Sequence, residues 1–134
     1  SRGIHEVAGA VKIRDSAAVF NTQSMRHLHE RQVVGIFPEG GRSPDGFLRK
    51  GKAGAIYIAA KLNRPIVPVA LQGFYDAWPK TRRFPRPVRC RIVFGEEMFF
   101  QDARGAEYRN IAAETHIRKV MMIIAGLLGQ RYRY

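Results

Sequence analysis

The chain reads Val33-Val34-Gly35-Ile36-Phe37-Pro38-Glu39-Gly40-Gly41-Arg42-Ser43 where an apolar run passes directly into a glycine-rich loop. The run 33–37 is short and almost wholly apolar, which predicts a buried parallel strand. Pro38 ends that strand, because proline has no N–H to give to a strand ladder. Residues 38–51 then hold four glycines and two prolines, a composition typical of a loop.

The segments on either side alternate between strand and helix patterns. The pattern predicts strands over 7–13, 33–37, 66–71 and 88–94, a helix that begins after Ser16, and helices over 52–62 and 106–128. This order favours an α/β fold with a largely parallel sheet flanked by helices, in a single domain over residues 1–134. Ligands bind beyond the carboxyl ends of strands in such sheets. The loops after Phe37 and Leu71 are therefore the places to expect a site.

The composition predicts a globular, strongly basic domain with anionic partners. The 134 residues suit one domain, and hydrophobic residues make up 46% of them. Lysine and arginine number 23 against 11 acidic residues, a net charge of +12, and 17 of the 23 are arginine. The planar guanidinium of arginine suits phosphates and anionic head groups better than the ammonium of lysine does. The expected partners are phosphorylated metabolites, CoA-type cofactors, an anionic membrane surface or nucleic acid.

Cysteine content and apolar run length limit the protein class. Cys90 is the single cysteine, so an intrachain disulfide framework and a cysteine-based zinc site are excluded. The longest apolar run, 120–128, is shorter than the ~20 residues of a spanning helix. The first residues lack the apolar core of a signal peptide, and residue 1 is not Met. We expect a cytoplasmic protein attached peripherally to a membrane, either processed or a piece of a longer chain.

The loop after the first apolar run carries residue types suited to an anion. Gly40 and Gly41 allow close approach of a ligand to backbone N–H groups. Arg42 offers two parallel donors to a phosphate, and Glu39 can orient Arg42 or accept a hydrogen bond from a substrate hydroxyl. The alternative is a tight surface turn with an ordinary Glu–Arg pair.

The block Phe37-Pro38-Glu39-Gly40-Gly41-Arg42-Ser43 resembles the F-P-E-G-T-R-S block of the glycerolipid acyltransferases. This family comprises lysophosphatidate (1-acylglycerol-3-phosphate) and glycerol-3-phosphate acyltransferases. Three further segments resemble family blocks in the family's order: 9–14, 47–54 and 67–73. The resemblance implies a glycerol-3-phosphate-acyltransferase-like fold.

The resemblance also implies an activity and a site. Family members move a fatty acyl group from acyl-CoA or acyl-carrier protein to the hydroxyl of a lysophospholipid or glycerol-phosphate acceptor, in phospholipid biosynthesis. No cofactor and no metal is implied, since the acyl thioester is a substrate. The implied acceptor-phosphate residues are Arg42, Glu39, Gly40, Gly41 and Arg14, with Lys12 and Ser43 in the substrate cleft.

The chain departs from the family pattern in two ways. Gly41 stands where threonine is usual, which removes a hydroxyl. More important, the family's general base is the histidine of an H-x4-D block, and no histidine of this chain has an aspartate five residues on. That block would precede the Arg14 segment by roughly 30 residues in the family. We expect this stretch to hold the acceptor half of a site and to be inactive alone; a non-catalytic phosphate- or lipid-binding relative is the alternative.

The remaining candidates have weaker patterns. Asp76 and Trp78 follow the strand predicted at 66–71, where they either line the substrate cleft or anchor a loop. The arginines at 82–91 form a solvated surface, a contact with lipid head groups or a contact with nucleic acid. A basic nucleic-acid-binding domain is disfavoured, because no zinc-finger, helix-turn-helix or RNP-like pattern is present. Cys90 is expected in a buried strand, and 120–128 in the core or on a membrane-facing surface.

Overall fold

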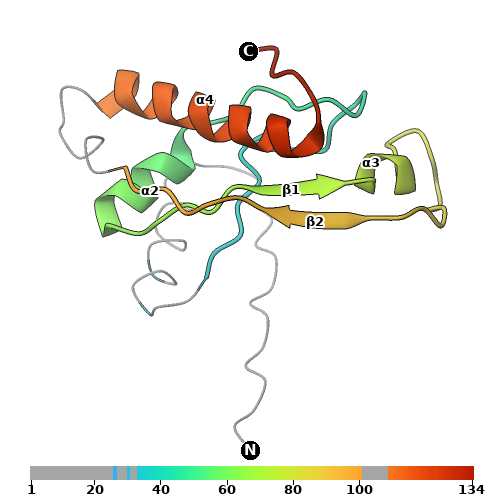
Figure 1. The fold of residues 1–134 in the computed structure, drawn as a ribbon, viewed down its shortest axis with the longest axis horizontal. Helices are drawn as coiled ribbons and strands as arrows, with labels where there is room; N and C mark the ends of the chain where they lie inside the picture. The colour runs from blue at the N-terminus through green and yellow to red at the C-terminus, as the bar shows by residue number, and fades with distance from the viewer. Residues whose placement is uncertain (1–25, 27–29, 31–32, 101–108) are drawn as a thin grey trace, which may run out of the picture.

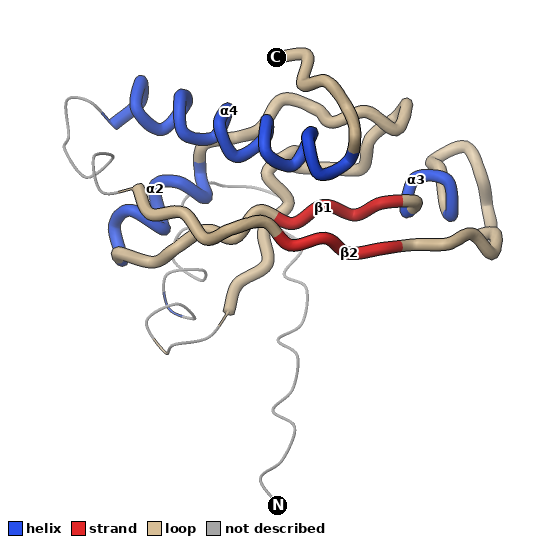
Figure 2. The backbone as a smooth tube through the Cα atoms, viewed as in Figure 1, coloured by secondary structure: helices blue, strands red, loops and turns tan. Residues whose placement is uncertain are grey.

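The computed structural model describes residues 26, 30, 33–100 and 109–134. The elements in chain order are α2 (Gly54–Leu62), β1 (Val69–Gln72), α3 (Phe74–Ala77), β2 (Arg91–Phe94) and α4 (Arg109–Leu128), as drawn in Figures 1 and 2. The strand predicted at 7–13 and the helix predicted after Ser16 lie outside the described residues.

Helix α2 confirms the helix predicted over 52–62. Alanine and isoleucine fill most of its length, and Ile56 and Ala60 are buried. Asn63 ends the helix in the left-handed conformation with φ of 53°, a C-cap position that asparagine tolerates. Its N–H donates to the carbonyl of Ala60 at 3.3 Å. Pro65 follows and cannot continue the helix.

Strands β1 and β2 pair antiparallel, so the prediction of a largely parallel sheet is not met by the described residues. The register places Val69 opposite Phe94 and Gln72 opposite Arg91, and an isolated bridge joins Ile66 to Met98. A parallel pair needs a crossover connection of roughly a dozen residues or more, most often a helix. Helix α3 has four residues and lies at the turn of the hairpin, so the chain simply reverses direction.

The apolar run 33–37 is not a strand in the structure, and that prediction was wrong. Val33 is 96% exposed and Phe37 is 73% exposed, so neither side chain is buried. A strand is defined by its ladder partners, and none of the described segments pairs with this run. Apolar composition alone therefore did not determine the conformation here.

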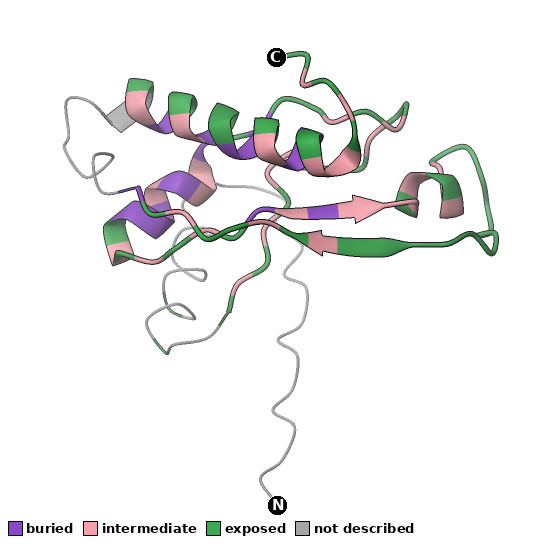
Figure 3. Ribbon diagram, in the orientation of Figure 1, coloured by how far each residue is buried: buried purple, intermediate pink, exposed green. Residues whose placement is uncertain are grey.

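Helix α4 supplies one side of the hydrophobic core. Ala113, Ile117, Val120, Met121 and Ile124 are buried at helical spacing, and they pack against α2 and β1. Figure 3 shows the buried stretches of α2, β1 and α4 turned toward one another. Of the two alternatives for 120–128, packing in the core is confirmed at Val120, Met121 and Ile124, whereas Met122 is exposed. No described helix is long and apolar enough to cross a bilayer.

Candidate functional site

The glycine-rich loop is a closed turn with a fixed backbone. The N–H of Gly40 donates to the carbonyl of Phe37 at 3.1 Å, and the N–H of Lys52 donates to the carbonyl of Pro38 at 2.9 Å. Gly40 has φ of +68°, a left-handed conformation that glycine adopts without strain. The turn therefore brings residues 38–42 against the segment that leads into α2.

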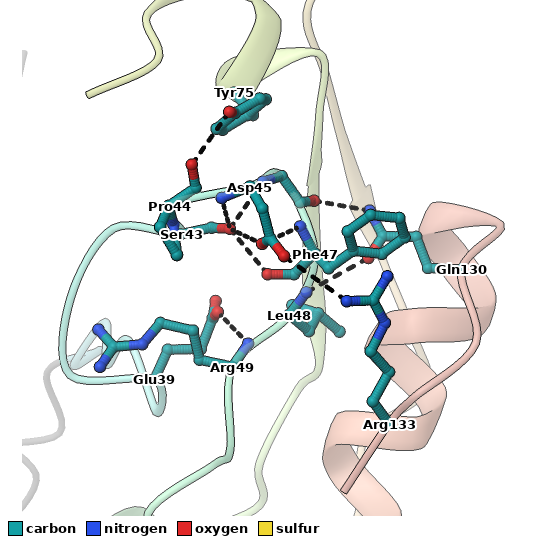
Figure 4. A network of polar contacts seen from close by, with 11 residues as sticks. Glu39, Ser43, Pro44, Asp45, Phe47, Leu48, Arg49, Tyr75, Gln130 and Arg133 are labelled. Carbon is teal, nitrogen blue, oxygen red and sulfur yellow. Dashed lines mark hydrogen bonds and ion pairs between the residues drawn. The ribbon is translucent and has the colours of Figure 1, made fainter. Parts of the chain in front are cut away.

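Glu39 stabilises this turn through the backbone of the following segment. Its Oε2 accepts a hydrogen bond from the N–H of Arg49 at 2.7 Å (Figure 4). Among the described residues no ion pair joins Glu39 to Arg42, so the expected orientation of Arg42 by Glu39 is not present. The carboxylate instead holds the two ends of the loop together.

Arg42 lies against Trp78, which is 36 residues later in the chain. Its Nη2 donates to the backbone carbonyl of Trp78 at 2.6 Å, and its guanidinium carbon lies 5.3 Å from the centre of a Trp78 ring. The structure thus brings together two residues that the sequence placed in two separate loops. Asp76 is exposed, and its backbone carbonyl accepts a hydrogen bond from Arg86 Nε at 2.7 Å.

Ser43 orders the second half of the loop. Its hydroxyl accepts a hydrogen bond from the N–H of Gly46 and donates to the carbonyl of Phe47, both at 2.8 Å. Asp45 Oδ1 accepts from the N–H of Phe47 at 3.1 Å. The Phe47 N–H, the Ser43 hydroxyl and the Arg133 guanidinium hold the pKa of Asp45 below its usual value. Ser43 therefore has a clear structural role here, whereas the sequence assigned it to the substrate cleft.

The last residues of the chain hold this same loop from the other side. The Gln130 side chain donates to the carbonyl of Gly46 at 2.9 Å and accepts from the N–H of Leu48 at 3.4 Å (Figure 4). Tyr132 accepts from the N–H of Gly51 at 3.1 Å. Arg133 lies 3.7 Å from the centre of the Phe47 ring. Residues 130–133, which the sequence analysis did not single out, thus fix the loop onto α4.

A pocket of about 430 Å³ opens beside the turn, and both basic and acidic side chains line it. Lys52 Nζ lies 3.0 Å from the position that a Cβ of Gly40 would occupy, and Arg49 Nη1 lies equally close to that of Gly41. Arg42 is not among the lining residues, so this pocket lies on the Glu39 side of the loop. The pocket is lined by Glu39, Arg49, Lys50, Gly51, Lys52, Ala53, Glu114 and Tyr134.

Arg49 and Lys52 are the basic residues that sequence reasoning missed as site candidates. Both fall inside the segment 47–54, which had been noted only as a block that follows the loop. Two basic side chains against a glycine turn raise the local positive potential, which favours a phosphate or carboxylate. The other predicted basic residues, Lys12 and Arg14, lie outside the described residues.

Comparison with known proteins identifies the family. The sequence model described as Acyltransferase matches residues 5–72, which include the whole of the glycine-rich loop. The chain belongs to the acyltransferase family.

Curated 1-acyl-sn-glycerol-3-phosphate acyltransferases are similar to a large part of the chain. The mouse 1-acyl-sn-glycerol-3-phosphate acyltransferase alpha is 32% identical over 79 residues, which are 58% of this chain and 28% of that protein. The 1-acyl-sn-glycerol-3-phosphate acyltransferase of Limnanthes alba is 45% identical over 96 residues, 68% of this chain and 34% of that protein. The chain thus spans about a third of the length of these relatives.

A solved acyltransferase structure shares the fold. The crystal structure of the 1-acyl-sn-glycerophosphate acyltransferase from Thermotoga maritima aligns with a TM-score of 0.64 and 25% identity. The alignment covers 85% of this chain and 46% of the other. The described elements therefore belong to the acyltransferase fold, although their two strands form only a small antiparallel sheet.

Proposed function

We propose that this chain forms the acceptor-binding part of a lysophosphatidate-type acyltransferase. The reaction moves a fatty acyl group from acyl-CoA or acyl-carrier protein to a hydroxyl of a lysophosphatidate or glycerol-phosphate acceptor. The observation that carries the proposal is the F-P-E-G-G-R loop: a rigid glycine turn bearing Arg42, in a chain of the acyltransferase family.

The charges around the loop support a phosphate as the recognised group. Arg42 presents a guanidinium whose five donors suit phosphate oxygens. Arg49 and Lys52 lie against the adjacent glycines. Hydrogen bonds to charged groups contribute about 1.5–3 kcal/mol each, so a phosphate is the part of the acceptor that such a site selects most strongly.

The chemical step needs a general base that takes the proton from the acceptor hydroxyl as it attacks the thioester carbonyl. In the family this group is the histidine of the H-x4-D block, which the sequence of residues 1–134 does not contain. We therefore propose that residues 1–134 contribute acceptor binding, and that the base comes from the H-x4-D segment of the family.

An acyl-transfer assay with matched acceptors tests this function. The protein is the chain with a relative's H-x4-D segment joined before Ser1, and the acceptors are lysophosphatidate and the monoacylglycerol that lacks its phosphate. Because the loop is assigned to the phosphate, kcat/KM should be at least about 10-fold higher for lysophosphatidate. Equal kcat/KM for the two acceptors would contradict the assignment of the loop to the acceptor phosphate.

A further inference from the structure

The connection between β1 and β2 projects beyond α2 and α4 at one end of the described structure (Figures 1 and 3). We define residues 78–91, which end at the first residue of β2, as the hairpin loop. Every residue from 80 to 92 is exposed, so this segment adds almost nothing to the core. A long, fully exposed segment of this kind costs conformational entropy to order, which suggests a role other than packing.

The hairpin loop carries half of the net charge of the chain. It holds six basic residues, and no acidic residue occurs from position 77 to 95. No carboxylate of the described residues forms an ion pair with any of the six. The basic residues are Lys80, Arg82, Arg83, Arg86, Arg89 and Arg91.

Aromatic and apolar side chains are interleaved with these charges. Phe84 is 71% exposed and Trp78 is 48% exposed, and Val88 is exposed as well. The Arg83 guanidinium carbon lies 5.6 Å from the centre of the Phe84 ring. Exposed aromatic residues beside arginines suit the boundary between lipid head groups and acyl chains, where amphipathic rings are favoured.

The hairpin loop is ordered by its own backbone before it meets any partner. Arg86 donates from its backbone N–H to the carbonyl of Ala77 at 2.9 Å. Trp78 Nε1 donates to the carbonyl of Arg82 at 3.1 Å. A preformed loop binds with a smaller loss of entropy than one that orders on contact.

We propose that the hairpin loop docks on the surface of an anionic lipid bilayer, with Trp78 and Phe84 at the interface and the arginines on lipid phosphates. The proposal goes beyond the transfer reaction and does not require turnover. It also places Arg42 near the bilayer, because Arg42 is bonded to the Trp78 carbonyl at the start of the loop. A phosphorylated lipid held in the bilayer would then present its phosphate at the level of Arg42.

Trp78 is the single tryptophan of the chain, so its fluorescence reports on this loop alone. The 134-residue chain is mixed with vesicles of phosphatidylcholine, and with vesicles of phosphatidylcholine and phosphatidylglycerol. We expect sedimentation with the anionic vesicles only, together with a blue shift of the Trp78 emission and protection from iodide quenching. Sedimentation without any change in Trp78 emission would overturn the proposal.

Matched charge variants locate the contact. The double variant Arg82→Gln/Arg83→Gln should bind anionic vesicles about 10- to 30-fold more weakly, since each basic residue at the surface contributes separately. The control Lys61→Gln/Lys119→Gln removes the same charge from exposed positions of α2 and α4. Its affinity for anionic vesicles should fall much less. Equal losses in the two proteins would mean that diffuse charge, and not the hairpin loop, binds the membrane.

Two more measurements complete the test. Phe84→Ala should weaken vesicle binding without changing its dependence on salt, because it removes apolar contact and no charge. Duplex DNA that shifts the Trp78 emission while anionic vesicles do not would assign the loop to nucleic acid and refute the membrane proposal. Circular dichroism of each variant should match that of the parent, since all the changed residues are exposed.

Discussion

The Glu39 carboxylate accepts the backbone N–H of Arg49 at 2.7 Å, and this hydrogen bond joins the two ends of the glycine-rich loop. The same loop is closed by the bond from Lys52 N–H to the Pro38 carbonyl. Glu39 therefore shapes the loop through backbone geometry, while the Arg42 side chain contacts Trp78 and makes no ion pair with Glu39 among the described residues.

Replacing Glu39 should separate its geometric role from its charge. Glu39→Gln retains an oxygen that accepts the Arg49 N–H, whereas Glu39→Ala does not. Because a hydrogen bond to a charged group contributes about 1.5–3 kcal/mol at most and this one is exposed, we expect Glu39→Ala to cost about 1 kcal/mol. Native-state hydrogen exchange at the Arg49 amide measures it. Identical exchange in the parent and in Glu39→Ala would show that the bond does not order the loop.

Arg42 should determine the affinity for the acceptor. In the chain extended with an H-x4-D segment, Arg42→Ala should raise the acceptor KM about 10- to 150-fold, which corresponds to about 1.5–3 kcal/mol for a charge-assisted contact. The acceptor KM of Arg42→Lys should lie between those of the parent and Arg42→Ala, because lysine keeps the charge but lacks the planar guanidinium. The KM for the acyl donor serves as the control and should not change. Unchanged acceptor kinetics in Arg42→Ala would refute the assignment.

The positions of α2 and α4 followed from local pattern, because propensity and capping are local. Asn63 and Pro65 fixed the end of α2, and the spacing of Ile117, Val120 and Ile124 fixed the buried face of α4. Pairing direction is a long-range property, and the apolar run 33–37 was mistaken for a buried strand. Cys90, expected in a buried strand, lies just before β2 and is exposed, as are Ile92 and Phe94 within that strand.

The contacts around the candidate site could not be predicted from the sequence, because they too are long-range. The sequence marked Arg42 and Trp78 as candidates, yet nothing in it linked two residues 36 positions apart. The contacts of Gln130 and Tyr132 with the loop depend on how α4 crosses the fold, so no local pattern marks them. The sequence was enough to recognise the motif around Arg42, but not the long-range contacts that hold it in place.

The loop around Asp45 should lose order in acid. The Phe47 N–H, then Ser43 and Arg133, lower the pKa of Asp45 in the folded chain. Because its pKa is lowered by folding, the Asp45 carboxylate stabilises the folded chain fully above its unfolded-state pKa, near pH 4. This stabilisation is lost as the pH falls through the pKa of Asp45 in the folded chain. Hydrogen exchange at Phe47 should accelerate over that range relative to the chemical rate. Asp45→Asn should remove the pH dependence; an equal dependence in Asp45→Asn would exclude Asp45 as its source.

Gly73 should tolerate no side chain. It has φ of +78°, and a Cβ there would lie 2.3 Å from the Arg89 carbonyl oxygen at the base of the hairpin loop. Gly129 also has positive φ, at +68°, but nothing lies within 4 Å of its Cβ position. Gly129→Ala should therefore cost only the left-handed strain, about 1–2 kcal/mol. Denaturant titrations should show a larger loss in the free energy of unfolding for Gly73→Ala than for Gly129→Ala. Equal losses in the two variants would show that the backbone relaxes around the clash.

Residues 1–134 alone should transfer no detectable acyl group from a thioester to a lysophospholipid. The proposed site holds the cations Arg42, Arg49 and Lys52, but no histidine of the chain has an aspartate five residues on to orient it. General-base catalysis contributes about 10²–10⁴-fold, so its loss leaves the hydroxyl a poor nucleophile. A radiolabelled acyl-transfer assay compares the 134-residue chain with the chain extended by the H-x4-D segment.

The extended chain should be active, and replacing the histidine of its H-x4-D segment by alanine should abolish that activity. Robust turnover by the short chain, lost on changing His5, His27, His29 or His116, would show that the base lies within these residues instead. Turnover by neither chain, with lysophosphatidate binding retained, would favour a relative that binds phosphorylated lipid without catalysis. The binding measurement separates that outcome from misfolding, because Arg42→Ala should then weaken binding in the short chain as well.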